Sequence, residues 1–105
     1  MIRLTEFELR KTYKRIIEID EIVGIYEVRI EGVSKPLKIK VKEMVNASGD
    51  RFVGMANLEI KGKGSLDYYR SMHPQRTKEE ALRDAVSGFC DHLSNEAEIR
   101  EIENW

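Results

Sequence analysis

The sequence predicts a single α+β domain, spanning residues 1–105, with its elements in the order α-β-β-β-α. Two segments begin with the Thr-x-x-Glu spacing of a helix capping box, at Thr5 and at Thr77. Between them, three segments alternate apolar and polar residues with the period of two that strands show when only one face is buried. Short, turn-rich connections join these segments. They favour a three-stranded antiparallel meander with both helices packed on its apolar face.

The first helix is expected over residues 5–19. Apolar residues recur along one face of such a helix at Leu9, Tyr13, Ile16 and Ile17. The competing interpretation is a strand through Ile16–Ile22, because the β-branched isoleucines in this stretch suit a sheet equally well. The sequence leaves both alternatives open for residues 1–22.

The strands are expected at Ile25–Glu31, Leu37–Glu43 and Phe52–Lys61. The second of them alternates apolar residues with lysines and is the predicted centre of the sheet. A hairpin loop at Ala47–Asp50 would place Lys38 opposite Glu59 and Lys40 opposite Asn57.

The second helix is expected to follow its cap at Thr77. Its apolar residues lie along one face, at Leu82, Val86, Phe89 and Leu93, with Ala85 beside them. Gly88 within this helix predicts close packing against the sheet. The remaining residues, about 94–105, either form a separate helical piece or fray.

This order of elements is similar to that of double-stranded-RNA-binding domains. In that family the last helix opens with a lysine-rich cluster directed at phosphates. Here the corresponding turn reads TKEEA, in which Lys78 is followed by Glu79 and Glu80, and these carboxylates would repel phosphate. The resemblance is therefore confined to the order of elements.

Composition indicates a globular chain. Hydrophobic residues make up 41% and charged residues 35%, and the net charge is −1. The single Cys90 excludes an intramolecular disulfide, and no apolar run has the length of a signal sequence or of a membrane span. We therefore expect a cytoplasmic protein that is a monomer or a weak homodimer and has no membrane partner.

The most unusual segment is the loop before the second helix, residues 68–76. It gathers aromatic, guanidinium and imidazole groups, which together can hold a protein or a small anionic ligand. The candidate binding residues are Tyr68, Tyr69, Arg70, His73 and Arg76. An alternative is that the tyrosines close the end of the core while Thr77 caps the helix.

Lysines on the polar face of the sheet form the second candidate site. A flat basic surface would bind nucleic acid weakly through its phosphates, without sequence preference. Its residues are Lys35, Lys38, Lys40, Lys42, Lys61 and Lys63. The alternative is that acidic residues on neighbouring strands neutralise these lysines.

No enzymatic motif accompanies these surfaces. Ser65, Asp67 and His73 contain the residue types of a nucleophilic triad, but nothing in the sequence brings them together. Cys90 and His92 project from opposite sides of a helix, so no metal site or cofactor is expected. The sequence thus predicts a small non-enzymatic binding or regulatory module that uses residues 68–76, with nucleic-acid binding as the alternative.

Overall fold

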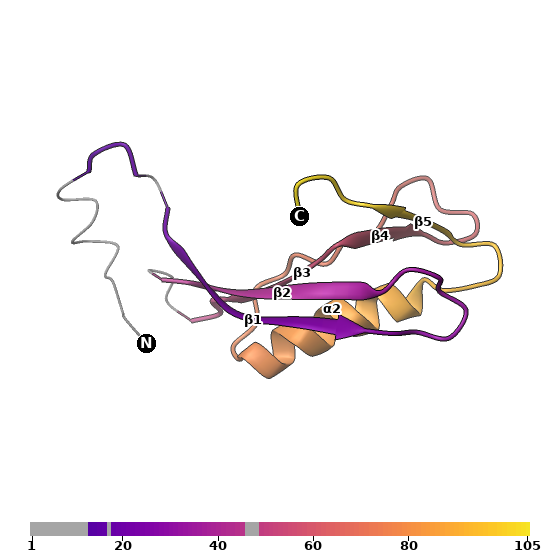
Figure 1. The fold of residues 1–105 in the computed structure, drawn as a ribbon, viewed down its shortest axis with the longest axis horizontal. Coiled ribbons are helices and arrows are strands. Elements are labelled where there is room, and N and C mark those ends of the chain that lie inside the picture. Colours follow the sequence, from indigo (N-terminus) through magenta and orange to yellow (C-terminus); the bar gives the residue numbers. More distant parts are fainter. Residues whose placement is uncertain (1–12, 17, 46–48) are drawn as a thin grey trace.

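The computed structural model describes residues 13–16, 18–45 and 49–105, and it has the mixed helix and strand content expected of the α+β class (Figure 1). Residues 5–12 and 17 of the expected first helix lie outside this description. Around residues 14–15 the chain turns, with the Ile16 backbone N–H donating to the Tyr13 carbonyl at 3.2 Å. The first strand, β1 (Asp20–Val28), begins at Asp20, five residues before the expected start at Ile25, and ends three residues before the expected end at Glu31. Neither a helix reaching residue 19 nor a strand starting at Ile16 is therefore present.

The predicted three-stranded antiparallel sheet is confirmed, with β2 (Leu37–Met44) between β1 and β3 (Phe52–Ala56). The predicted pairing of β2 with β3 is wrong by two residues, because Lys40 lies opposite Met55. The cause is that the connection between β2 and β3 is longer than the predicted loop at Ala47–Asp50. The last hydrogen bond before this connection runs from the Met44 N–H to the Arg51 carbonyl. A shift of two residues preserves the face on which every side chain lies.

The expected third strand divides at Asn57. Beyond this residue β4 (Leu58–Lys61) leaves the sheet and pairs with β5 (Glu98–Glu101) in a separate antiparallel ribbon. The expectation of a helical or frayed C-terminal segment is therefore wrong. The free edge of β4 supplies backbone partners, and Ile99 lies opposite Ile60 in the ribbon.

Asn57 holds this junction together. Its backbone N–H donates to the Lys38 carbonyl at 2.9 Å, and its Oδ1 accepts the Lys38 backbone N–H at 2.7 Å. Its carbonyl accepts the Ile102 N–H at 2.8 Å, and its side-chain amide donates to the Pro36 carbonyl at 3.3 Å. One residue thus connects the sheet, the ribbon and the C-terminal segment.

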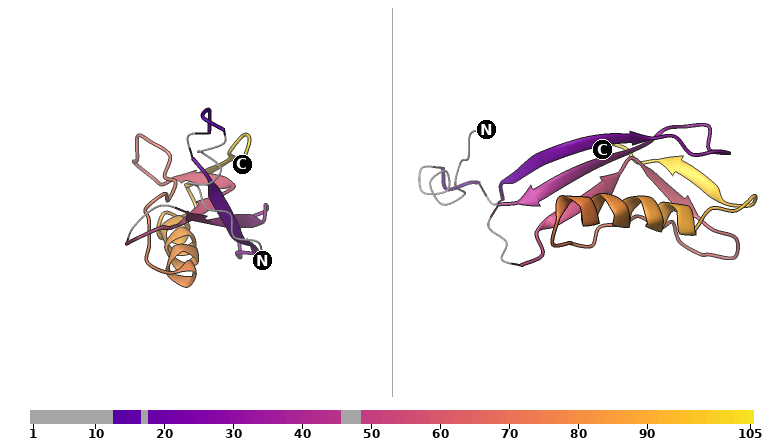
Figure 2. Two further views of the ribbon diagram at one scale, coloured as in Figure 1. Left: turned by 90° about the vertical axis from the view of Figure 1, so that its left-hand side faces the viewer. Right: turned by 90° about the horizontal axis from the view of Figure 1, so that it is seen from below.

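Helix α2 (Lys78–Asp91) begins as predicted, with the Thr77 hydroxyl accepting the Glu80 N–H at 3.0 Å. The helix packs on β3 and β2, whereas β1 lies at the far edge of the sheet (Figure 2). Buried residues from β2, the β3–β4 segment and α2 form the core: Leu37, Ile39, Val41, Ala56, Leu58, Ile60, Ala81, Ala85 and Phe89. The approach is closest at Gly54, where an added Cβ would lie 2.5 Å from the Ala81 carbonyl oxygen.

Gly54→Ala is expected to destabilise the fold by about 1–3 kcal/mol, because the added methyl group forces the α2 backbone away from β3. The matched control is Gly62→Ala, whose Cβ would meet only ordinary contacts, the nearest at 3.5 Å. Urea unfolding of both variants measures the difference. Equal stability of the two would show that Gly54 does not set the helix position.

Asn57→Ala is expected to lower the free energy of unfolding by about 1–3 kcal/mol, because the Lys38 N–H and the Pro36 carbonyl lose their side-chain partner. Asn95→Ala, in an exposed turn, serves as the control and is expected to have little effect. The same unfolding assay compares them. A loss no larger than that of the control would contradict the role given to Asn57.

Candidate functional site

The structure places Tyr68 on the β4–β5 ribbon. Its hydroxyl donates to Glu98 Oε2 at 3.1 Å, and the Arg100 guanidinium lies 3.8 Å from its ring centroid. Lys61 Nζ lies 5.4 Å from the same ring. Tyr68 therefore joins a cluster of side chains that holds the ribbon together.

Tyr69 closes one end of the core. It exchanges two backbone hydrogen bonds with Ile60, and its ring stacks on that of His92 with centroids 4.3 Å apart. Its hydroxyl lies where a side chain at Gly88 would otherwise project. The close packing predicted at Gly88 is thus against this ring rather than against the sheet itself.

The other residues of the 68–76 segment face different surroundings. Ser71 is buried and donates to Asp84 of α2. Arg70 lines a hollow of about 330 Å³ over the ribbon, shared with Glu59, Arg100, Glu101, Ile102 and Glu103. His73 is exposed, and Arg76 lies at the start of α2. The five candidate residues therefore do not converge on one site.

Most lysines of the second candidate site lie beside acidic partners. Four form ion pairs, Lys35 with Glu101, Lys61 with Glu98, Lys63 with Glu96 and Lys42 with Asp20, over 3.3–4.0 Å. Three of the four acidic partners come from the C-terminal segment, which sequence reasoning had placed in a helix or a frayed end. These pairs reduce the positive potential available to a polyanion, and nucleic-acid binding stays a prediction.

Lys40 meets a different partner, the C-terminal Trp105. Its Nζ lies 4.6 Å from the indole ring centroid, and the indole N–H donates to the Met55 carbonyl at 2.7 Å. At Lys38 the backbone bonds to Asn57. The terminal tryptophan therefore packs on the lysine-bearing side of the sheet.

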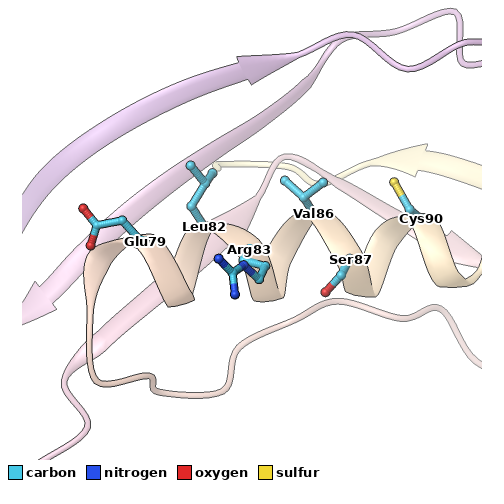
Figure 3. A pocket seen from close by; sticks show the side chains of 6 residues that line it. All are labelled: Glu79, Leu82, Arg83, Val86, Ser87 and Cys90. Carbon is cyan, nitrogen blue, oxygen red and sulfur yellow. The ribbon is translucent and has the colours of Figure 1, made fainter.

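An apolar groove runs along the flank of α2 and is here called the α2 groove. It comprises two hollows, of about 420 and 390 Å³, which share Glu79 as a lining residue. The first is lined by Leu82, Arg83, Val86, Ser87 and Cys90, and the second by Val23, Phe52, Arg76, Thr77 and Lys78. Leu82, Val86 and Cys90 rise from one flank of the helix toward β1 and β2 (Figure 3).

The sequence pattern shows the apolar stripe at Leu82 and Val86 and predicts that it belongs to the core. In the structure the fully buried helix positions are Ala81, Ala85 and Phe89, so Leu82 and Val86 remain half-exposed. The apolar face of α2 is thus wider than the strip that the sheet covers. This excess width is the signal in the sequence that identifies the groove.

Three cations without an ion-pair partner among the described residues line the α2 groove. Within the described parts of the chain, seven Lys and Arg side chains form ion pairs and eight do not. Three of these eight, Arg76, Lys78 and Arg83, line the groove. Glu79 is the one carboxylate that lines the groove. The groove therefore combines an apolar floor with a mainly cationic rim.

The pKa of Glu98 is held below its ordinary value, first by the Tyr68 hydroxyl and then by the charge of Lys61. Ionised Glu98 is therefore favoured in the folded chain, and its stabilising contribution is lost as the pH falls through this lowered pKa.

Tyr68→Phe is expected to raise the pKa of Glu98 toward its ordinary value. Carboxyl-carbon NMR titration measures the shift, with the exposed Tyr13→Phe as control, and an unchanged pKa in Tyr68→Phe would contradict the assignment.

Searches against protein-family models, curated proteins and solved structures each found no match. Among residues 13–16, 18–45 and 49–105, no helix has both the length and the apolar character needed to span a bilayer. Over the same residues, no three His, Cys, Asp or Glu side chains group as potential metal ligands. The α2 groove is therefore the surface feature from which a function is inferred below.

Proposed function

We propose that this chain is a non-enzymatic binding module that holds a segment of a protein partner in the α2 groove. The observation that supports this proposal is the coincidence of an apolar floor with a rim of unpaired cations on one side of α2. Arg76 joins the groove to the 68–76 segment, so part of the predicted binding loop belongs to the proposed site.

Protein is favoured over a small anionic ligand because the cationic candidates are dispersed. Arg70 and Arg76 line separate hollows, and His73 lines neither of them. A small anion needs several donors converging within hydrogen-bond distance. An elongated apolar groove instead matches a peptide, whose side chains contribute buried area along its length.

The proposal is tested by residue-resolved NMR of the labelled chain at low and raised salt. The probes are a helical amphipathic peptide, a strand-forming amphipathic peptide, inorganic phosphate and a short double-stranded RNA. We expect one of the peptides to shift Val23, Leu82, Val86 and Cys90. Shifts confined to the lysine face with RNA, or to arginines with phosphate, would overturn the proposal.

Leu82→Ser provides the matched variant. The half-buried Leu82 lines the groove, whereas Leu66 is 95% exposed and outside it, so Leu66→Ser is the control. Leu82→Ser is expected to weaken peptide binding by about tenfold or more, and the control should leave it unchanged. Amide spectra of both variants verify that they fold, and equal binding by two folded variants would contradict the groove assignment.

A further inference from the structure

We infer that the occupant of the α2 groove is an amphipathic α-helix of a partner protein that carries acidic residues on the flank next to Arg76, Lys78 and Arg83. This inference rests on the proposed function and names the shape and charge of the partner segment. Three features support it: the width of the sheet face left beside α2, the half-exposed apolar residues on β1 and on α2, and the charge of the rim.

The first feature is the position of α2 across the sheet. The helix packs on β3 and β2 and barely reaches β1 (Figure 2). Packed helices lie about 8–10 Å apart, and this distance equals about two strand spacings of 4.7–4.9 Å. A helix adjacent to α2 would therefore lie over β1, the part of the sheet that α2 leaves open.

The second feature is half-exposed apolar surface on both β1 and α2. Val23, Tyr26 and Val28 of β1 are only half-buried, although they face the core side of the sheet. Leu82 and Val86 of α2 are likewise half-buried, and with Cys90 they line a hollow whose lining comes from α2 alone (Figure 3). From Glu79 to Cys90 the groove follows the helix for about 17 Å, at 1.5 Å per residue, which matches about three turns of a second helix.

The third feature is the charge of the rim. Arg76, Lys78 and Arg83 face the groove against the single carboxylate of Glu79. Acidic side chains on the bound helix would pair with them, each exposed pair contributing a fewfold in affinity. Complementary charge also selects against basic helices with the same apolar stripe, because like charges would then meet at the rim.

The experiment uses the full chain and three synthetic 18-residue peptides that share one apolar stripe. The first carries Glu on its flanks, the second carries Lys there, and the third is the acidic peptide with two internal prolines that prevent a helix. Fluorescence polarisation measures affinity, and NMR shifts at Val86 and Cys90 locate binding. We expect the acidic helix to bind about tenfold or more tighter than either other peptide, and its advantage over the basic helix to shrink at high salt.

Charge reversal at the rim supplies the matched pair of variants. Lys78→Glu with Arg83→Glu is expected to invert the preference between acidic and basic peptides. The control variant, Lys35→Glu with Lys63→Glu, changes the net charge by the same amount at exposed residues that form ion pairs outside the groove. It should still bind the acidic peptide more tightly than the basic one. The same inversion in both double variants would assign the preference to net charge and overturn the inference.

The outcomes separate this inference from the proposed function. Acidic and basic helices that shift the groove equally, or a proline peptide that binds as well as the acidic helix, would overturn the inference while leaving a protein-binding groove. Failure of every peptide to shift the groove residues would overturn both.

The chain also carries Leu9 with Glu6 and Glu8 in its N-terminal segment. Peptide binding seen only in a Leu9→Asp variant would assign the groove to that segment and overturn the inference of a partner helix.

Discussion

The arrangement of the molecule depends on the hydrogen bonds of Asn57. A strand that continued straight from Phe52 to Lys61 would keep both halves in one sheet beneath α2. Asn57 instead uses its backbone and side chain to hold the start of β2 while its carbonyl accepts Ile102. The chain can then change direction without leaving these backbone groups unsatisfied, which would be costly in a part-buried position. β3 stays under the helix, and β4 becomes free to pair with β5.

The distribution of charge follows from this junction. Because β5 pairs with β4, Glu98 lies opposite Lys61, and Glu96 and Glu101 reach Lys63 and Lys35. Exposed pairs of this kind contribute little to stability, but they neutralise the side of the molecule where lysines gather. The cations without such partners include those at the α2 groove. The C-terminal segment thus influences which surface keeps its positive charge, although it lies far from the groove in sequence.

The elements that could be predicted from the sequence are those that short-range patterns specify. The capping box at Thr77 and the alternation in β1, β2 and β3 report interactions between residues that are close in sequence, and the structure contains these elements. The C-terminal strand was not predictable in this way, because Ile99, Ile102 and Trp105 are spaced as in a helix. Its conformation is decided by the free edge of β4, a partner about 40 residues away in the chain. The same limit applies to Tyr68 and Tyr69, whose surroundings come from β4, β5 and the end of α2.

The candidate groove shows how one close contact can determine a surface. The stripe of Leu82 and Val86 is visible in the sequence, but whether it is core or groove depends on where α2 lies across the sheet. Gly54 permits the Ala81 carbonyl to approach β3 to a distance that any side chain would prevent. With the helix at this position, Ala81, Ala85 and Phe89 are its buried residues and the neighbouring stripe of Leu82 and Val86 is only partly buried. A bulkier residue at position 54 would collide with the Ala81 carbonyl and displace α2 from β3, so the packing that stabilises the core also bears on the proposed binding surface.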